Sequence, residues 1–399
     1  MKAVFITNII ILIVRLQHVT STLTTADRIK AAGYDSKTYT LFTKDGYGLT
    51  IFRIGGRINQ TTSSSAPVVL MMHGLKSSSD CWVMNGLNDA LVYDMVDSGY
   101  DVWLANARGN NYGKQHLQLT IDSPEFWDFS WHEIGVIDLP NTIDYILQKT
   151  QQPDMHYVGH SQGTTVMFVL LSMQPEYKEK LKSLHMFAPI AYLKHTRSPV
   201  VLSLAPLVNM HTPLDSLVSY TTSRYLPIAA RILRTCNNPN ASKQFCGLLT
   251  ALLNGGMSDY LQQSILPDMY RTHPGSISAR QSFHFIQLYI SGHFCQYDYG
   301  SDGNLQHYNR TTPPDYEVNK IMPRFPFHFY YSDFDDFATK PDVEKLLDVL
   351  GNRSIPHFIN LKNFAHFDFM WGYNIKRLIN PVVLKIMQET EDALKNDSL

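Results

Sequence analysis

Residues 155–165 read MHYVGHSQGTT, and this stretch decides the fold. MHYV predicts a short buried strand, and the apolar run TTVMFVLLS that begins at Thr164 predicts a helix. Between them stands GHSQG, the pattern G-x-S-x-G, with Ser161 at its centre. At a tight turn from strand to helix, this pattern lifts a serine hydroxyl above the carboxyl edge of a parallel sheet. The context therefore indicates a nucleophilic serine; the alternative is a Gly-Ser turn without a chemical role.

Short apolar runs without strict alternation occur on both sides of this turn and alternate with helical patterns. Such runs are typical of strands that are buried on both faces. The strands are expected at 67–72, 101–105, 155–158, 184–187, 325–331 and 356–361, and the helices at 86–98, 137–150, 164–173, 341–350 and 381–395. Alternation of strand and helix predicts an α/β fold, with a mostly parallel sheet and helices on both of its faces.

One long segment interrupts the alternation. Residues 191–315 are rich in Leu, Met, Tyr and Pro but contain no convincing strand. A connection of this length fits an inserted helical subdomain better than a loop. We therefore expect a core formed by 23–190 and 316–399, with 191–315 inserted as a helical cap or lid. Periodicity does not distinguish whether the apolar residues of the insertion form its own core or face a ligand.

A serine nucleophile needs a base, and the base needs an orienting carboxylate. On a fold of this kind the chain order is Ser, then Asp or Glu, then His. The expected strand 325–331 is followed by Asp333, Asp335 and Asp336, which are three candidates for the acid. The last expected strand is followed by His366, which stands out among sixteen histidines because strand, loop and chain order agree.

Two backbone N–H groups are expected to stabilise the oxyanion. One should come from Gln162, directly after the nucleophile, and the other from the loop that follows the strand at 67–72. That loop begins His73-Gly74-Leu75, and we assign the second donor to Leu75 because Gly74 lets the backbone approach closely. The alternative for this loop is a plain turn at the end of a strand.

Composition excludes some classes of function. The 399 residues contain 34 Lys and Arg against 35 Asp and Glu, so the net charge is -1. Without a basic excess, the electrostatic signature of nucleic-acid binding is missing. With 44% hydrophobic and 12% aromatic residues, the chain can bury a large core, which argues against disorder as its main state. No CxxC pair occurs, so we expect neither a redox site nor a zinc site, and catalysis by a serine, a histidine and an acid requires no metal or organic cofactor.

Several features favour export. Lys2 precedes an apolar stretch from Val4 to Val14, about half of what a membrane-spanning helix needs, so residues 1–22 are interpreted as a secretory signal peptide. The alternative is a buried N-terminal helix. No other stretch is long and apolar enough to be a transmembrane segment. Glycosylation triplets begin at Asn59, Asn240, Asn309, Asn352 and Asn396.

Four cysteines allow three pairings in an oxidising compartment. Cys236 and Cys246 flank the polar stretch NNPNASKQF, so we expect a disulfide that closes this small loop. Cys81 and Cys295 are then expected to be buried free thiols.

Motifs along nearly the whole chain resemble those of the acid lipases of animals, the group that includes gastric lipase, lysosomal acid lipase and insect relatives. The resemblance implies an α/β-hydrolase core with a helical cap and lid, and an exported, glycosylated protein. The matching segments are DGYGLTIFRI (45–54), HGL (73–75), ANARGNNYG (105–113), FWDFSWHEIGVIDLP (126–140), YVGHSQGTT (157–165), QYDYG (296–300) and AHFDFMWG (365–372).

The resemblance also implies roles for particular residues. It places the nucleophile on Ser161, the histidine on His366 and the acid on Asp335, but the local pattern departs from the family's, which leaves Asp336 as a rival. Lys76 is a second departure, because the family commonly has Leu after HGL. The spacing of Cys236 and Cys246 resembles the family's disulfide.

The function implied is hydrolysis of neutral lipid esters, triacylglycerols or sterol esters, through an acyl-enzyme on Ser161. The expected partner is a lipid ester at an oil–water or membrane interface, and we expect a monomer, secreted or in the lysosomal lumen. One alternative is a soluble carboxylesterase acting on short esters. Another is a lipid-binding relative that has lost catalysis, which the crowded acidic segment after residue 332 keeps open.

Overall fold

A central sheet carries the site. In the computed structural model, which describes residues 23–58, 63, 65–208, 232–233, 235–238 and 241–397, nine strands form this sheet. Their order is β1-β2-β4-β3-β6-β7-β8-β9, with β5 added beside β2, and every pair from β4 to β9 is parallel. The strands are β1 (Tyr34–Phe42), β2 (Tyr47–Arg57), β3 (Val68–Met72), β4 (Asp101–Leu104), β5 (Gln115–His116), β6 (Met155–His160), β7 (Leu181–Phe187), β8 (Phe327–Ser332) and β9 (Ser354–Ile359).

The six strands expected from apolar runs are β3, β4 and β6 to β9, so the prediction of a mostly parallel α/β sheet is confirmed. The antiparallel hairpin β1–β2 and the short β5 were not expected from the sequence. In β1 most side chains are partly or fully exposed, so polar residues interrupt the apolar run that marks a strand buried on both faces.

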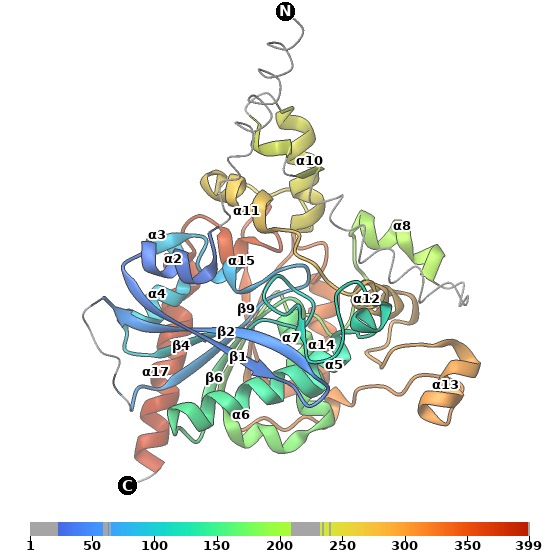
Figure 1. Ribbon diagram of the computed structural model, residues 1–399, viewed down its shortest axis with the longest axis horizontal. Helices are drawn as coiled ribbons and strands as arrows, with labels where there is room; N and C mark the ends of the chain where they lie inside the picture. The colour runs from blue at the N-terminus through green and yellow to red at the C-terminus, as the bar shows by residue number, and fades with distance from the viewer. Residues whose placement is uncertain are drawn as a thin grey trace, which may run out of the picture.

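Helices cover both faces of the sheet (Figure 1). α4 lies against α17, and α6 lies against α7, which follows β6 directly. The helices outside the insertion are α2 (Thr25–Ala31), α3 (Gly86–Asp89), α4 (Leu91–Asp97), α5 (Trp131–Glu133), α6 (Leu139–Thr150), α7 (Gln162–Met173), α14 (Lys340–Leu350), α15 (Asp368–Trp371), α16 (Ile375–Leu378) and α17 (Asn380–Asp397). Among the helices of the described ranges, none combines the length and apolar character that crossing a membrane requires.

The segment between β7 and β8 is helical and adds no strand to the sheet within its described part. Its helices are α8 (Pro199–Val208), α10 (Lys243–Asn254), α11 (Leu266–Thr272), α12 (Ala279–Ser291) and α13 (Gly300–Tyr308). In Figure 1, α10 and α11 lie above the sheet and α8 lies to its side. Arg28 of α2 forms an ion pair with Asp268 of α11, which fastens this segment to the N-terminal part of the chain.

The cysteines behave as the sequence predicts. A disulfide joins Cys236 to Cys246 at the start of α10, and Cys81 and Cys295 are free and buried. Of the five glycosylation triplets, those at Asn309, Asn352 and Asn396 have exposed asparagines, whereas Asn59 and Asn240 lie outside the described residues, as does the segment 1–22.

Candidate active site

Ser161 occupies a strained turn between β6 and α7. Its backbone has φ 53° and ψ −119°, a conformation that residues other than glycine rarely adopt. The Ser161 N–H donates to the backbone oxygen of Phe187, at 3.0 Å, which holds the turn against β7. Strain of this kind persists only where the surrounding structure imposes it, and here it directs the serine to the wall of a cavity.

The glycines on either side of Ser161 are required for steric reasons. A Cβ atom at Gly163 would lie 2.3 Å from the backbone oxygen of Met72, and one at Gly159 would lie 2.9 Å from the backbone of Gly163. Helix α7 can therefore begin directly against β3 only because position 163 has no side chain. This is the close approach that the G-x-S-x-G pattern predicts.

Of the three candidate acids, Asp335 contacts His366. The His366 Nδ1–H donates to Asp335 Oδ2, at 2.7 Å, and both side chains are buried. The other carboxylate oxygen, Oδ1, accepts hydrogen bonds from the N–H groups of Phe337 and Ala338, at 2.8 and 2.9 Å. The Asp335 carboxylate is thus fixed in a position that leaves His366 Nε2 available on the cavity side.

The two neighbouring acids have other partners. Asp336, which the sequence left as a rival, accepts a hydrogen bond from Arg197 Nε at 2.8 Å and is 24% exposed. Asp333 is exposed and lies 3.5 Å from Lys340 Nζ. Neither of them contacts His366 among the described residues.

The loop that carries His366 is held on both sides. Its backbone N–H donates to the backbone oxygen of Asn254, at 3.0 Å, and its backbone oxygen accepts from His160 Nε2, at 2.9 Å. Burial, with a smaller contribution from His366, holds the pKa of His160 well below its usual range. His160 is therefore neutral and acts as a fixed donor that positions the His366 loop.

The loop after β3 passes directly beside Ser161. A Cβ atom at Gly74 would lie 3.0 Å from Ser161 Cβ, so glycine permits this approach. His73 Nδ1 donates to the Gly74 oxygen, at 2.8 Å, and its Nε2 accepts from the Ala107 N–H, at 3.2 Å. Burial lowers the pKa of His73 to about 4, so this imidazole also stays neutral. Its role in shaping the loop was not predicted, because sequence gives no sign of which buried histidine bonds to backbone.

The predicted oxyanion donors lie on these two turns. Leu75 lines the cavity beside Ser161. Gln162 is the first residue of α7, so its N–H has no partner within the helix and lies at the positive end of the helix dipole.

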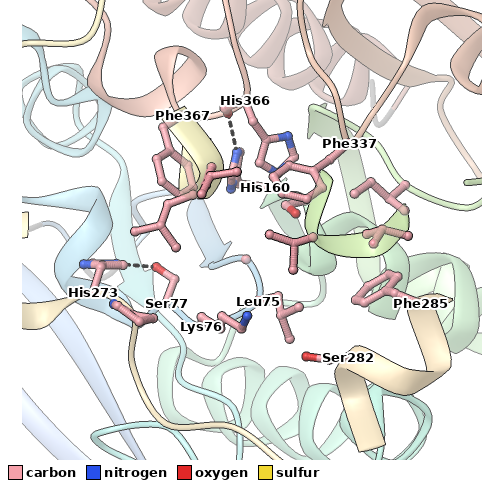
Figure 2. Close-up of a pocket in the computed structure, with 18 of the residues that line it drawn as sticks. Leu75, Lys76, Ser77, His160, His273, Ser282, Phe285, Phe337, His366 and Phe367 are labelled. Carbon is pink, nitrogen blue, oxygen red and sulfur yellow. Dashed lines mark hydrogen bonds between the residues drawn. The ribbon is translucent and has the colours of Figure 1, made fainter. Parts of the chain in front are cut away.

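Ser161 and His366 open into one cavity of about 1090 Å³, counting the part that is open to solvent. Figure 2 shows His366, Phe337 and Phe367 along one side, with Leu75 and Phe285 facing them. Much of the remaining wall is aliphatic and comes from the segment between β7 and β8: Leu193, Val200, Val201, Leu204, Leu252, Leu253 and Ile286. The arrangement can therefore hold a long apolar ligand against a serine, a histidine and a carboxylate in sequence.

The chain that leaves α10 runs between the acid loop and the histidine loop. Asn254 Oδ1 accepts from the Phe367 N–H, at 2.7 Å, and the Gly255 oxygen accepts from the Asp336 N–H, at 2.9 Å. A Cβ atom at Gly255, where φ is 61°, would lie 2.5 Å from the Phe337 ring. Sequence analysis missed these positioning residues; the Asn-Gly-Gly that ends α10 is their only signal. Nowhere in the described ranges do three or more His, Cys, Asp or Glu side chains gather as metal ligands would.

Comparison with known proteins agrees with this geometry. Residues 25–86 match the family described as a partial alpha/beta-hydrolase lipase region, and residues 67–221 match the alpha/beta hydrolase fold. Lipase 3 of Drosophila melanogaster is 36% identical over 92% of this chain and 93% of its own length. Human gastric triacylglycerol lipase is 33% identical over 92% of both chains. The chain belongs to this family of lipases.

The resemblance drawn from the motifs is thus confirmed, and with it the α/β-hydrolase fold. Two solved structures show the fold alone at low identity. An esterase from Thermogutta terrifontis is 13% identical, with a TM-score of 0.51, over 89% of this lipase and 99% of its own chain. A carboxylesterase from Bacillus subtilis is 13% identical, with a TM-score of 0.52, over 91% of this lipase and 95% of its own chain.

Proposed function

We propose that this lipase hydrolyses neutral lipid esters, triacylglycerols or sterol esters, through an acyl-enzyme on Ser161. The observation that carries the proposal is the His366–Asp335 hydrogen bond of 2.7 Å at a cavity that Ser161 also lines. The apolar wall suits long acyl chains, and the relative at 33% identity is a gastric triacylglycerol lipase by name.

In the first step, His366 Nε2 accepts the proton of the Ser161 hydroxyl while Oγ attacks the ester carbonyl carbon. Asp335 keeps the proton on His366 Nδ1 and stabilises the imidazolium that forms. Its Oδ1 is saturated by two backbone N–H groups, so the carboxylate does not turn away from the histidine.

The negative charge that develops on the carbonyl oxygen is stabilised by the N–H groups of Leu75 and Gln162. The intermediate collapses when His366 returns its proton to the alcohol oxygen, and the alcohol leaves. Water, deprotonated by His366, then attacks the acyl-enzyme; the ester bond to Ser161 breaks and the fatty acid is released.

We assign residues 191–315 as the cap and residues 23–190 and 316–399 as the two parts of the core. The cap assignment is supported by the aliphatic residues that this segment contributes to the cavity. Outside the cavity α8 also exposes Leu202, next to the partly exposed Val200 and Leu204. Apolar surface beside an active site suits contact with a lipid interface.

We further propose that the protein is exported, to the extracellular space or the lysosomal lumen. The disulfide fits an oxidising compartment, and the exposed positions of Asn309, Asn352 and Asn396 suit glycan attachment. The signal-like composition of residues 1–22 supports the same destination.

The test is hydrolysis of emulsified trioleoylglycerol and of cholesteryl oleate by the purified glycosylated protein, from pH 4 to pH 8. Ser161→Ala should lower fatty-acid release by several orders of magnitude. Ser301→Ala, at an exposed position of α13, is the matched control and should retain full activity. Hydrolysis of short soluble esters alone would identify a carboxylesterase. No Ser161-dependent hydrolysis of any ester would leave lipid binding as the function.

A further inference from the structure

Lys76 places an ammonium group in a mostly apolar cavity. It directly follows Leu75 and lines the same cavity as Ser161 and His366. Figure 2 shows its nitrogen turned towards the interior of the cavity, on the side of Leu75 and Ser282. Within the described residues, the cavity wall contains no Asp or Glu, so this charge has no counter-ion there.

The backbone at Lys76 is fixed, so the side chain does not enter the cavity by chance. Its φ is 59°, the left-handed conformation, and its carbonyl oxygen accepts from the Gly275 N–H at 2.6 Å. On the following residue, the Ser77 hydroxyl and His273 Nε2 share a hydrogen bond of 2.8 Å. The segment between β7 and β8 therefore holds the Lys76 carbonyl and the Ser77 side chain, and with them the position of Lys76 on the cavity wall.

The buried Arg and Lys side chains in the described part of the chain are paired, whereas Lys76, which is half-buried, is not. The buried side chains of Arg28, Arg108 and Lys182 each form ion pairs with carboxylates. For Lys76, no carboxylate lies within ion-pair distance in the part of the chain that the structure describes. An ammonium that is partly withdrawn from water gains stability from an anionic partner, so an unpaired cation at this cavity suits a ligand that supplies the anion.

The titratable groups that share the cavity wall do not compensate Lys76. They are His160, His273 and His366. Burial lowers the pKa of His160 well below its usual range and that of His273 to about 3, so both remain neutral. Burial also lowers the pKa of Lys76, which is the response of a charge that has lost water and gained no counter-ion.

We propose that Lys76, with the Ser282 hydroxyl, binds an anionic group, a phosphate or a carboxylate, on the lipid held at Ser161. The proposal rests on the ester-hydrolase function argued above and extends its substrates from neutral lipid esters to anionic ones. Because Leu75 is the proposed oxyanion donor and Lys76 is the next residue, the anion lies near the ester and not at the end of the acyl chain. A lipid ester with a phosphate on its glycerol fits this position, and so does the carboxylate of a released fatty acid.

The experiment compares two substrates that differ only by a phosphate, 1-oleoylglycerol and 1-oleoylglycerol 3-phosphate, in micelles of a neutral detergent. The measured quantity is the ratio of kcat/KM for the phosphate ester to kcat/KM for the neutral ester. Lys76→Leu should lower this ratio about tenfold or more, because a charge-assisted hydrogen bond at a partly buried site is lost. Lys76→Arg should keep the ratio close to that of the unaltered protein.

Lys385→Leu, at an exposed position of α17, controls for general attraction between the protein and anionic micelles and should leave the ratio unchanged. A second arm measures inhibition by oleate with the neutral substrate. Weaker inhibition of Lys76→Leu with an unchanged ratio would identify the product carboxylate as the anion. An unchanged ratio together with unchanged inhibition would overturn the proposal.

Binding separates this proposal from the function on which it rests. Calorimetric titration of 1-oleoylglycerol 3-phosphate into Ser161→Ala, with and without Lys76→Leu, needs no turnover. About tenfold weaker binding in the double variant would support the anion site even if no ester were hydrolysed. Equal binding in both proteins, with Ser161-dependent hydrolysis of 1-oleoylglycerol intact, would reject the anion site and leave the hydrolase assignment in place.

Discussion

The Ser258 hydroxyl donates to the carboxylate of Asp368, with its oxygen 2.7 Å from Asp368 Oδ2. The same carboxylate oxygen accepts from the Ala365 N–H, at 2.6 Å, so Asp368 closes the turn that carries His366. Ser258 belongs to the segment between β7 and β8 and follows Asn254, which bonds to the same turn. The position of the histidine therefore depends on contacts from the segment between β7 and β8 as well as from the sheet.

Asp368 makes the stability of this lipase depend on pH. Burial raises its pKa from 3.8 to about 7, against the opposing effect of its hydrogen bonds to Ser258 and Ala365. The folded protein therefore keeps a proton on Asp368 that the unfolded chain releases, so the contribution of Asp368 to the free energy of unfolding falls as pH rises from about 4 to about 7. Asp368→Asn should remove this part of the slope, measured by urea denaturation at pH 4.5, 5.5, 6.5 and 7.5.

Ser258→Ala is the informative companion. Removing its hydrogen bond takes away an interaction that favours the charged carboxylate, so the pKa of Asp368 should rise further. The decline in stability should then extend to higher pH than in the unaltered protein. If the free energies of unfolding of Asp368→Asn and of the unaltered protein differed by the same amount at every pH, Asp368 would not be the group that causes this pH dependence.

Asp335 and Asp336 are adjacent, yet we expect opposite results from the same substitution. Asp335→Asn should lower kcat by about a thousandfold or more, because an amide cannot hold the required tautomer or stabilise the imidazolium. Asp336→Asn should stay within severalfold of the unaltered protein, because its partner is the half-exposed Arg197. The measurement is the rate at which the two purified variants hydrolyse trioleoylglycerol. Comparable losses of kcat in both variants would argue against Asp335 as the sole acid.

This pair also shows where sequence reasoning ends. Chain order and the ends of two strands selected Ser161 and His366 as candidates and limited the candidate acids to residues 333–336. The choice between Asp335 and Asp336 depends on the direction in which each side chain leaves the loop. That direction is set by the N–H groups of Phe337 and Ala338, which no pattern reports.

Long-range contacts explain the other omissions. Asn254 lies far from His366 in sequence, and nothing in its local pattern indicates that α10 ends against the histidine loop. The hairpin β1–β2 was missed because one face of β1 remains in solvent, which breaks the apolar run. The parallel strands were predicted because burial on both faces makes every residue of such a run apolar.

Gly163→Ala should disrupt the turn at Ser161. The added methyl group would meet the backbone oxygen of Met72 at 2.3 Å, and a backbone atom of β3 cannot move aside as a flexible side chain would. We expect a loss of about 1–3 kcal/mol in the free energy of unfolding, together with most of the activity.

Gly247→Ala is the matched control for this substitution. Gly247 lies within α10, and a Cβ atom there would meet no other atom within 4 Å. Because alanine is favoured over glycine in a helix interior, this variant should gain about 0.5–1 kcal/mol. Equal tolerance of both substitutions would show that the close approach of α7 to β3 is not needed.

A row of histidines across β7, β8 and β9 should oppose the effect of Asp368. His328 lies between His185 and His357, and it shares a hydrogen bond of 3.0 Å with His357. Burial, with a smaller contribution from His357, lowers the pKa of His328 from 6.5 to about 4. Between pH 6.5 and pH 4 the unfolded chain therefore binds a proton at His328 that the folded protein does not bind. The stability that neutral His328 allows is complete above pH 6.5 and is lost as pH falls towards 4.

His328→Phe keeps a ring in the stack and removes the titrating group. We subtract the free energy of unfolding of the unaltered protein from that of the variant, both measured by urea denaturation. This difference should be more positive at pH 4.5 than at pH 7.5. The loss of the hydrogen bond to His357 lowers stability at both pH values. Because burial also lowers the pKa of His357, the difference between the two values reports the protonation of the His328–His357 pair. The same offset at both would mean that protonation of His328 does not limit the stability of this lipase in acid.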